Sequence, residues 1–205
     1  MESEYDALDG NGRKTYTLYE QEIATKTALR VSAKNVGQTG ASFEAVWDEA
    51  IDDRKIAKVE LYRDGTLQTN VSVGLEGLEG LLSDCDYTLR VDYEYKGKTY
   101  TLNVPFHTAA KTEPTYVIEN PTKTQTSIGF DLTETDPDNI GTATKIELLH
   151  KGVIVKTENA DVRSFTDLLS NNEYTVRVTY TYDLNDGTGA QTKTAELAVR
   201  TEAKT

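Results

Sequence analysis

An internal repeat constrains the fold of this 205-residue chain more than any other feature of its sequence. The segment LLSDCDYTLRVDYEY at 81–95 matches LLSNNEYTVRVTYTY at 168–182, with nine of fifteen positions identical at an offset of 87. At the same offset, KVELYRDG at 58–65 matches KIELLHKG at 145–152. Because each copy carries its own set of apolar residues, the sequence predicts two small domains of the same kind in tandem.

Upstream of these segments the alignment of the two repeats shifts. Ser42 pairs with Ser127 at an offset of 85, which predicts a two-residue length difference in the intervening loop. On this alignment Leu132 of the second repeat stands where the first repeat has Trp47.

A similar tail closes both repeats and also an early segment, namely TAAKT at 108–112, TEAKT at 201–205 and IATKT at 23–27. The early segment begins with YDALDGNG at 5–12, which resembles YDLNDGTG at 182–189. We therefore expect residues 1–27 to be the closing hairpin of a preceding repeat or an N-terminal extension. The two domains are expected at 28–111 and 112–205.

Apolar and polar residues alternate strictly along the two longest matched segments. In residues 87–95 every second side chain is apolar or aromatic, and the same holds for residues 174–182. A period of two places one set of side chains on the buried face of a β-strand. Together with shorter alternating segments upstream, the pattern predicts six core residues: Trp47, Leu89, Val91, Phe130, Val176 and Val178.

Turn signals separate these alternating segments, among them Asp64-Gly65, Lys96-Gly97 and Asp186-Gly187. No stretch shows a helical period with capping residues. The expected fold class is therefore all-β, with two tandem immunoglobulin-like antiparallel β-sandwiches preceded by a β-hairpin segment.

Several of these features together resemble the fibronectin type III family. Trp47 lies on an early strand, VELY at 59–62 precedes an Asp-Gly turn, and a Leu stands six residues before a Tyr in each repeat. These Leu and Tyr pairs resemble the tyrosine corner of that family, and they are Leu81 with Tyr87 and Leu168 with Tyr174.

The resemblance covers 28–111 and 112–205 and implies what the corner does. A buried ring fills the end of the core, while its hydroxyl binds a backbone group of the crossing loop. The chain departs from the family pattern at Leu132 and in lacking a Pro beside either corner. The Tyr-rich strand followed by an Asn/Asp-Gly hairpin is similar to repeats of bacterial surface proteins and tailed-phage virion proteins.

Composition argues against several classes of function. With 22 Lys and Arg against 34 Asp and Glu, the formal charge of −12 would repel a nucleic acid backbone. The single cysteine, Cys85, excludes an intrachain disulfide. Only His107 and His150 could act as a histidine base, and they lie in different repeats at positions that do not match. We expect no catalytic residues, no cofactor and no membrane insertion.

One constellation of carboxylates remains. The family resemblance brings the loop after the second strand and the late hairpin loop to one end of the second domain, and their polar residues are Glu134, Asp136, Asp138, Asp183, Asn185 and Asp186. Calcium takes six to eight oxygen ligands, so this end is a candidate for it. Asp and Asn also form turns without any ion, and this is the reading that we prefer, with no metal site.

The leading functional hypothesis is a non-catalytic, semi-rigid spacer or adhesion array in a phage virion or a bacterial cell-surface protein. Its partners would be other protein modules or copies of the same chain. The alternative is an accessory carbohydrate- or protein-binding module attached to an extracellular enzyme. Binding of a cell-surface glycan would need an exposed aromatic platform, and the tyrosines not assigned to the core are Tyr62, Tyr100 and Tyr116.

Overall fold

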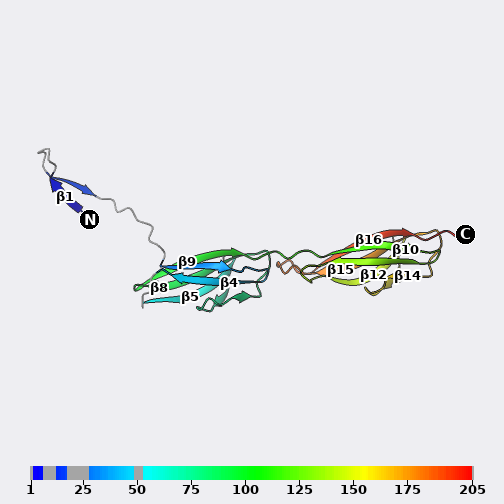
Figure 1. Cartoon of the computed structure of the whole chain (residues 1–205), viewed down its shortest axis with the longest axis horizontal. Coiled ribbons are helices and arrows are strands. Elements are labelled where there is room, and N and C mark those ends of the chain that lie inside the picture. The colour runs from blue at the N-terminus through cyan, green and yellow to red at the C-terminus, as the bar shows by residue number, and fades with distance from the viewer. Residues whose placement is uncertain (1, 7–12, 18–27, 49–52, 205) are drawn as a thin grey trace.

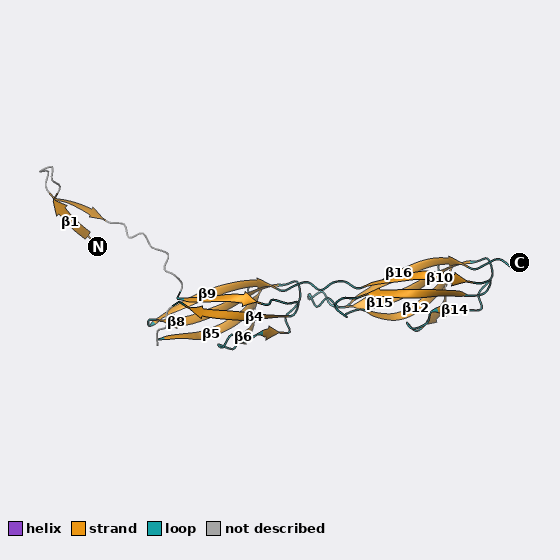
Figure 2. Ribbon diagram, viewed as in Figure 1, coloured by secondary structure: helices purple, strands orange, loops and turns teal. Residues whose placement is uncertain are grey.

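The computed structural model describes the backbone of residues 2–6 and 13–17 and the complete residues 28–48 and 53–204. No helix occurs among them. The strands form a two-stranded hairpin and two seven-stranded modules that lie end to end (Figure 1 and Figure 2). The prediction of an all-β chain with two tandem immunoglobulin-like sandwiches is confirmed.

The first module packs a three-stranded sheet against a four-stranded sheet. The smaller sheet has the order β3 (Leu29–Lys34), β4 (Gly40–Trp47), β7 (Leu78–Glu79). The larger sheet has the order β6 (Thr66–Val71), β5 (Arg54–Arg63), β8 (Asp86–Tyr95), β9 (Lys98–His107). All of these pairings are antiparallel.

The second module repeats this architecture. Its smaller sheet has the order β10 (Thr115–Lys123), β11 (Ile128–Thr135), β14 (Ser164–Phe165). Its larger sheet has the order β13 (Val153–Glu158), β12 (Thr142–His150), β15 (Glu173–Tyr182), β16 (Gln191–Arg200).

The period-two pattern accounts for the burial of the central strands. In β8 the side chains of Leu89 and Val91 are fully buried, and in β15 so are those of Val176 and Val178. Their polar neighbours alternate toward the outer face of the sheet. Phe130 of β11 is 4% exposed and packs into the second core from the opposite sheet. Each module therefore has its own apolar core.

The strands β1 (Glu2–Asp6) and β2 (Arg13–Thr17) form an antiparallel hairpin of their own. Their register places Tyr5 opposite Lys14. The remainder of the expected closing hairpin, residues 1, 7–12 and 18–27, lies outside the described residues.

Strand register corrects the alignment of the two repeats. Leu29 pairs with Trp47 across β3 and β4, and Tyr116 pairs with Glu134 across β10 and β11. The offset therefore remains 87 along these strands, and the predicted offset of 85 is wrong. The counterpart of Trp47 is Glu134 rather than Leu132. The match of Ser42 with Ser127 was misleading. The second repeat departs from regular pairing through a bulge in β10 after Glu119 and not through a longer loop.

The same end of each core is closed by an aromatic ring from a different strand. In the first module Trp47 meets Tyr93 edge to face, with ring centroids 5.8 Å apart. Trp47 is only partly buried because it is the last residue of β4, so it lies at the end of the core and not at its centre. In the second module Tyr116 takes this place, with its centroid 4.5 Å from that of Tyr180. Tyr116 is 6% exposed, so it belongs to the core, to which the sequence pattern did not assign it.

Candidate interaction site at the joint between the modules

A short linker connects the modules and is anchored on the second one. Strand β9 ends at His107 and β10 begins at Thr115. Within this segment Pro114 is fully buried, and it packs closely against Gly141. A Cβ atom at Gly141 would lie 2.9 Å from the Cβ of Pro114, which is closer than such atoms approach. The end of the linker is therefore held in place by the second module.

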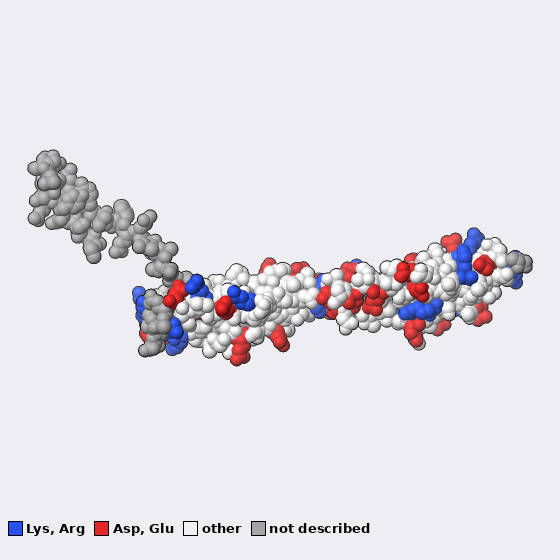
Figure 3. Space-filling model, in the orientation of Figure 1, with Lys and Arg blue, Asp and Glu red and all other residues white. Residues whose placement is uncertain are grey.

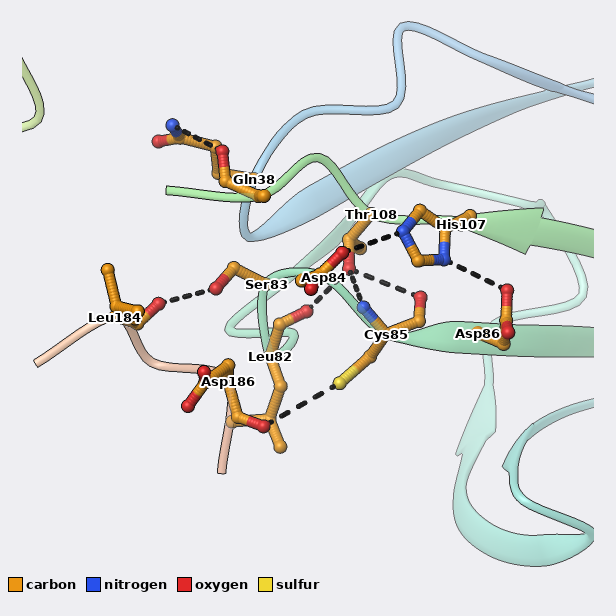
Figure 4. A network of polar contacts seen from close by, with 11 residues as sticks. Gln38, Leu82, Ser83, Asp84, Cys85, Asp86, His107, Thr108, Leu184 and Asp186 are labelled. Atoms are coloured by element: carbon orange, nitrogen blue, oxygen red, sulfur yellow. Dashed lines mark hydrogen bonds and ion pairs between the residues drawn. The ribbon is translucent and has the colours of Figure 1, made fainter. Parts of the chain in front are cut away.

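The first module contributes a corner, residues 81–85, that crosses between its sheets. The Leu82 N–H donates to the Tyr87 hydroxyl at 2.9 Å. The buried Thr108 hydroxyl donates to the Leu82 carbonyl at 2.7 Å and accepts from the Cys85 N–H at 3.0 Å (Figure 4). Backbone groups that cross the end of the core are thus paired by side chains of the same module. In both modules the group that the tyrosine hydroxyl binds is a donor, an N–H.

The second module contributes a long loop, residues 183–190, between β15 and β16. Two aspartates shape it, because Asp183 accepts from the Asn185 N–H at 2.7 Å and Asp186 accepts from the Thr188 N–H at 2.9 Å. Asn185 adopts a left-handed backbone with φ of 54°, which asparagine tolerates better than most residues. The loop is therefore held in one conformation by its own polar side chains.

This loop docks on the corner of the first module through four polar contacts. The Ser83 N–H donates to the Asn185 carbonyl at 2.8 Å, and the Asn185 side-chain amide donates to the Leu81 carbonyl at 3.1 Å. The Ser83 hydroxyl donates to the Leu184 carbonyl, and the Cys85 thiol lies 4.0 Å from the Asp186 carbonyl (Figure 4). Ser83 is fully buried by this contact. Burial also raises the pKa of the Cys85 thiol, which disfavours the reactive thiolate.

A second contact joins the modules beside the linker. Asp138, in the loop between β11 and β12, accepts from the Gln38 side-chain amide at 2.7 Å and from the Thr112 N–H at 2.6 Å. These hydrogen bonds, the Thr112 N–H first, lower the pKa of Asp138. The carboxylate thus binds both the first module and the linker, and the joint has two separate attachment points.

The carboxylates that were candidates for calcium have other partners. Glu134 accepts from the Tyr116 hydroxyl at 2.5 Å, and Asp136 accepts from the Gly141 N–H at 2.6 Å. Within residues 28–48 and 53–204, no group of three or more His, Cys, Asp or Glu is placed to hold a metal ion. Acidic side chains nonetheless gather on the second module beside the joint (Figure 3). The loop after the second strand and the late hairpin loop do lie at one end of the second domain, as expected, and there they form the joint with the first module.

The tyrosines considered for ligand binding also have partners. The Tyr62 hydroxyl donates to Glu60 at 3.2 Å, and Tyr100 stacks on Tyr93 with centroids 5.4 Å apart. Tyr93 and Tyr100 pair across β8 and β9, and such a cross-strand pair stabilises a sheet without a ligand. With Tyr116 buried, the three tyrosines do not form one aromatic platform.

The two histidines lie in unrelated surroundings. His107 contacts Asp86 at 2.9 Å through Nδ1 and Asp84 at 3.1 Å through Nε2. His150 packs against Tyr174 with ring centroids 4.9 Å apart and the ring planes tilted by 34°. The carboxylates, Asp86 first and then Asp84, raise the pKa of His107. His107 therefore links the end of β9 to the corner that receives the docking loop.

We expect the first module to lose stability as the pH rises through the pKa of His107. The unfolded-state pKa is about 6.5, so the two ion pairs contribute fully below that pH and are lost above the raised folded pKa. Replacing Asp86 by Asn should lower the pKa of His107 more than replacing Asp84 by Asn. Titration of the His107 ring by NMR measures this order, and equal pKa values in both variants and the parent chain would contradict it.

Strand order identifies the fold. In each module the first, second and fifth strands form one sheet, and the fourth, third, sixth and seventh form the other in that order. This is the arrangement of a fibronectin type III sandwich. Both modules have the fibronectin type III fold.

Comparison with solved structures finds fibronectin type III modules in each of three similar chains. They are the fibronectin(III)-like modules of Clostridium thermocellum CbhA, a two-domain fibronectin type III segment from chicken tenascin, and the central fibronectin-III array of RIM-binding protein. Sequence identities are 14%, 12% and 17%, with TM-scores of 0.30, 0.33 and 0.28. The alignments cover 85%, 84% and 85% of this chain and 95%, 98% and 68% of the others.

Other comparisons return no relative. No family model matches the sequence, and no curated protein matches it. The described part of the chain also contains no helix that is long and apolar enough to cross a membrane.

Neither the role of the two buried threonines nor the docking of the loop was predicted from the sequence, although the sequence contains a signal for each. Thr108 and Thr201 begin the matched tails, and both are buried and hydrogen bonded to the corner of their own module. The offset between repeats is 87 at Tyr95 and Tyr182 but 93 at the two threonines. The six extra residues lie in the docking loop, so the length difference between the repeats marks the contact.

Proposed function

We propose that this chain is a non-catalytic part of a semi-rigid spacer or adhesion array, extracellular and carried by a bacterial cell surface or a phage virion. The observation that carries the proposal is the docking of residues 183–190 on the corner at 81–85. Two modules joined only by a flexible linker would adopt many relative angles. A loop that bonds back to the preceding module, together with the contacts of Asp138, restricts those angles.

The repeated fold supports a structural or interaction role. Each module pairs its own strands around its own core, and within the described residues the modules meet only at their ends. The surface location rests on the similarity of the Tyr-rich strands and long hairpin loops to repeats of bacterial surface and tailed-phage proteins. An array of such modules would project whatever it carries by a fixed distance.

The N-terminal hairpin fits the same proposal as the end of a preceding repeat. Eight residues separate the paired Tyr5 and Lys14, and eight separate the paired Tyr182 and Gln191. The hairpin of the first module encloses only two residues between Tyr95 and Lys98. The N-terminal hairpin thus shares its register with the second module, and we propose residues 1–27 as a further copy of that closing segment.

We expect Asn185→Ala to loosen the joint without unfolding either module. The change removes the hydrogen bond to the Leu81 carbonyl. It also places alanine, whose side chain cannot form a local hydrogen bond, in a left-handed backbone. Together these effects should weaken the joint by about 1–3 kcal/mol. Residual dipolar couplings measure the result, because a stiff joint gives one alignment tensor for both modules and a loose joint gives two.

Asn171→Ala is the matched control. Asn171 also has a left-handed backbone, with φ of 56°, but it lies at the far end of the second module. Its replacement should leave the single tensor unchanged. Two different tensors in the unaltered chain would contradict the spacer proposal.

A further inference from the structure

The corner of the second module, residues 168–172, repeats the corner that receives the docking loop. Leu168, Leu169 and Ser170 stand where the first module has Leu81, Leu82 and Ser83, and only the last two residues of the five differ. This corner lies at the end of the second module that faces away from the first (Figure 1). It is therefore a copy of a known docking surface at an end of the chain where the described residues place no other module.

Hydrogen bonds hold the two corners in the same shape. The Leu169 N–H donates to the Tyr174 hydroxyl at 3.0 Å, as the Leu82 N–H does to Tyr87. The Thr201 hydroxyl donates to the Leu169 carbonyl at 2.7 Å and accepts from the Asn172 N–H at 3.0 Å. These distances match those made by Thr108 in the first module. The backbone groups that would meet a loop are thus positioned in advance.

The second attachment point is repeated as well. The Leu81 N–H donates to the Thr39 carbonyl and the Leu168 N–H to the Thr126 carbonyl, both at 3.0 Å. This places Gln125 at the position of Gln38, which binds Asp138 across the joint. Within the described residues the side chain of Gln125 makes no hydrogen bond, so a donor is available there.

The two corners differ in what covers them. Ser83 is fully buried by the docked loop, whereas Ser170 is partly exposed and its amide and hydroxyl have no hydrogen-bond partner among the described residues. Leu169 is 60% exposed, although the equivalent Leu82 is only partly exposed and lies beside Gly187 of the docked loop. An apolar side chain and two free polar groups are thus presented together.

We propose that the corner at 168–172 is a second docking surface and that its occupant is the long closing hairpin loop of a following module of the same kind as the second. The loop of the second module itself is already engaged at 81–85, and the two-residue turn of the first module is too short to dock. The N-terminal hairpin has Leu8 where the docked loop has Asn185, so it lacks the amide that binds the corner, and we assign the occupant to a further module. This inference rests on the proposed spacer function and names the partner that extends it.

The first experiment extends the full chain by a second copy of residues 113–205 after Thr205. The junction then reads TEAKTEPTYV, which differs from the natural linker TAAKTEPTYV at one position. We expect hydrogen exchange of the Ser170 amide to slow by about tenfold or more, toward the rate of Ser83. Asn185→Ala in the added copy should abolish this protection, while the same change in the original copy should not.

Unprotected Ser170 in a folded extended chain would overturn the docking proposal, and it would leave the spacer function standing if the first joint still gives one alignment tensor. Protection of Ser170 in the unextended chain that rises with concentration would assign the surface to a second copy and would also overturn it.

The second experiment needs no extension. In the 205-residue chain, Asp84→Asn combined with Cys85→Asn converts the first corner to the sequence of the second. If the second corner can receive a loop, this double variant keeps the Ser83 amide protected and the single alignment tensor. Loss of both would show that the LLSNN sequence does not dock and would overturn the proposal, even if the extended chain did not fold.

Discussion

Replacing Phe130 by Ala is expected to lower the free energy of unfolding of the second module by about 3–5 kcal/mol. The ring is 4% exposed, it stacks on Phe165 with centroids 6.2 Å apart, and its removal leaves a cavity that the two packed sheets cannot close. This is a large part of the stability of a small domain.

The two modules can be followed separately in one experiment. Trp47 is the only tryptophan, so fluorescence reports the first module, while circular dichroism reports both. In Phe130→Ala the Trp47 transition should change by at most about 1–3 kcal/mol, the contribution of the joint hydrogen bonds that are lost when the second module unfolds first. Val117→Ala, at a side chain 51% exposed, is the control and should change stability by less than about 0.5 kcal/mol. An equal loss in both modules would mean that they unfold as one unit.

Tyr87→Phe and Tyr174→Phe are each expected to destabilise their own module by about 1–2 kcal/mol. Each change keeps the ring in the core but leaves a backbone N–H, that of Leu82 or Leu169, without its acceptor. An unpaired backbone donor next to a core is costly because water does not replace the lost hydroxyl fully. Chemical denaturation followed by the two probes measures both values.

Tyr100→Phe provides the matched control, because this tyrosine is 41% exposed and its hydroxyl makes no hydrogen bond within the described residues. Its replacement should be nearly neutral. If all three variants behaved alike, the reading of Leu81 with Tyr87 and Leu168 with Tyr174 as tyrosine corners would fail. Tyr87→Phe should in addition speed exchange of the Ser83 amide, since it loosens the corner on which the loop docks.

Much of the fold could be predicted because strand burial follows directly from the alternation of side chains. Leu89, Val91, Val176 and Val178 lie on the inner faces for this reason. Alternation does not show which strand supplies the ring that closes a core. A Leu and Trp pair in the first module became a Tyr and Glu pair in the second, and only the register of β10 and β11 reveals that exchange.

The joint was harder to predict because turn formation alone is enough to explain the residue types found in its loop. Asp, Asn and Gly in residues 183–190 are turn formers, and both aspartates do shape the loop. Nothing in a local pattern states that the same loop also bonds to residues 104 positions earlier. The length difference between the two closing hairpins is the only sequence feature that distinguishes a docking loop from an ordinary turn.

The direction in which the loop reaches has a consequence for how such a chain matures during synthesis. The bond between Asn185 and Leu81 spans 104 residues and comes from the last hairpin of the second module. During translation the first module can complete its sheets while the second is still being made, since domains generally fold as units from the N-terminus. The angle between them is set only after β16 has left the ribosome. In a growing chain the angle at the most recently made linker therefore stays variable. Each joint becomes rigid only when the module that follows it is complete.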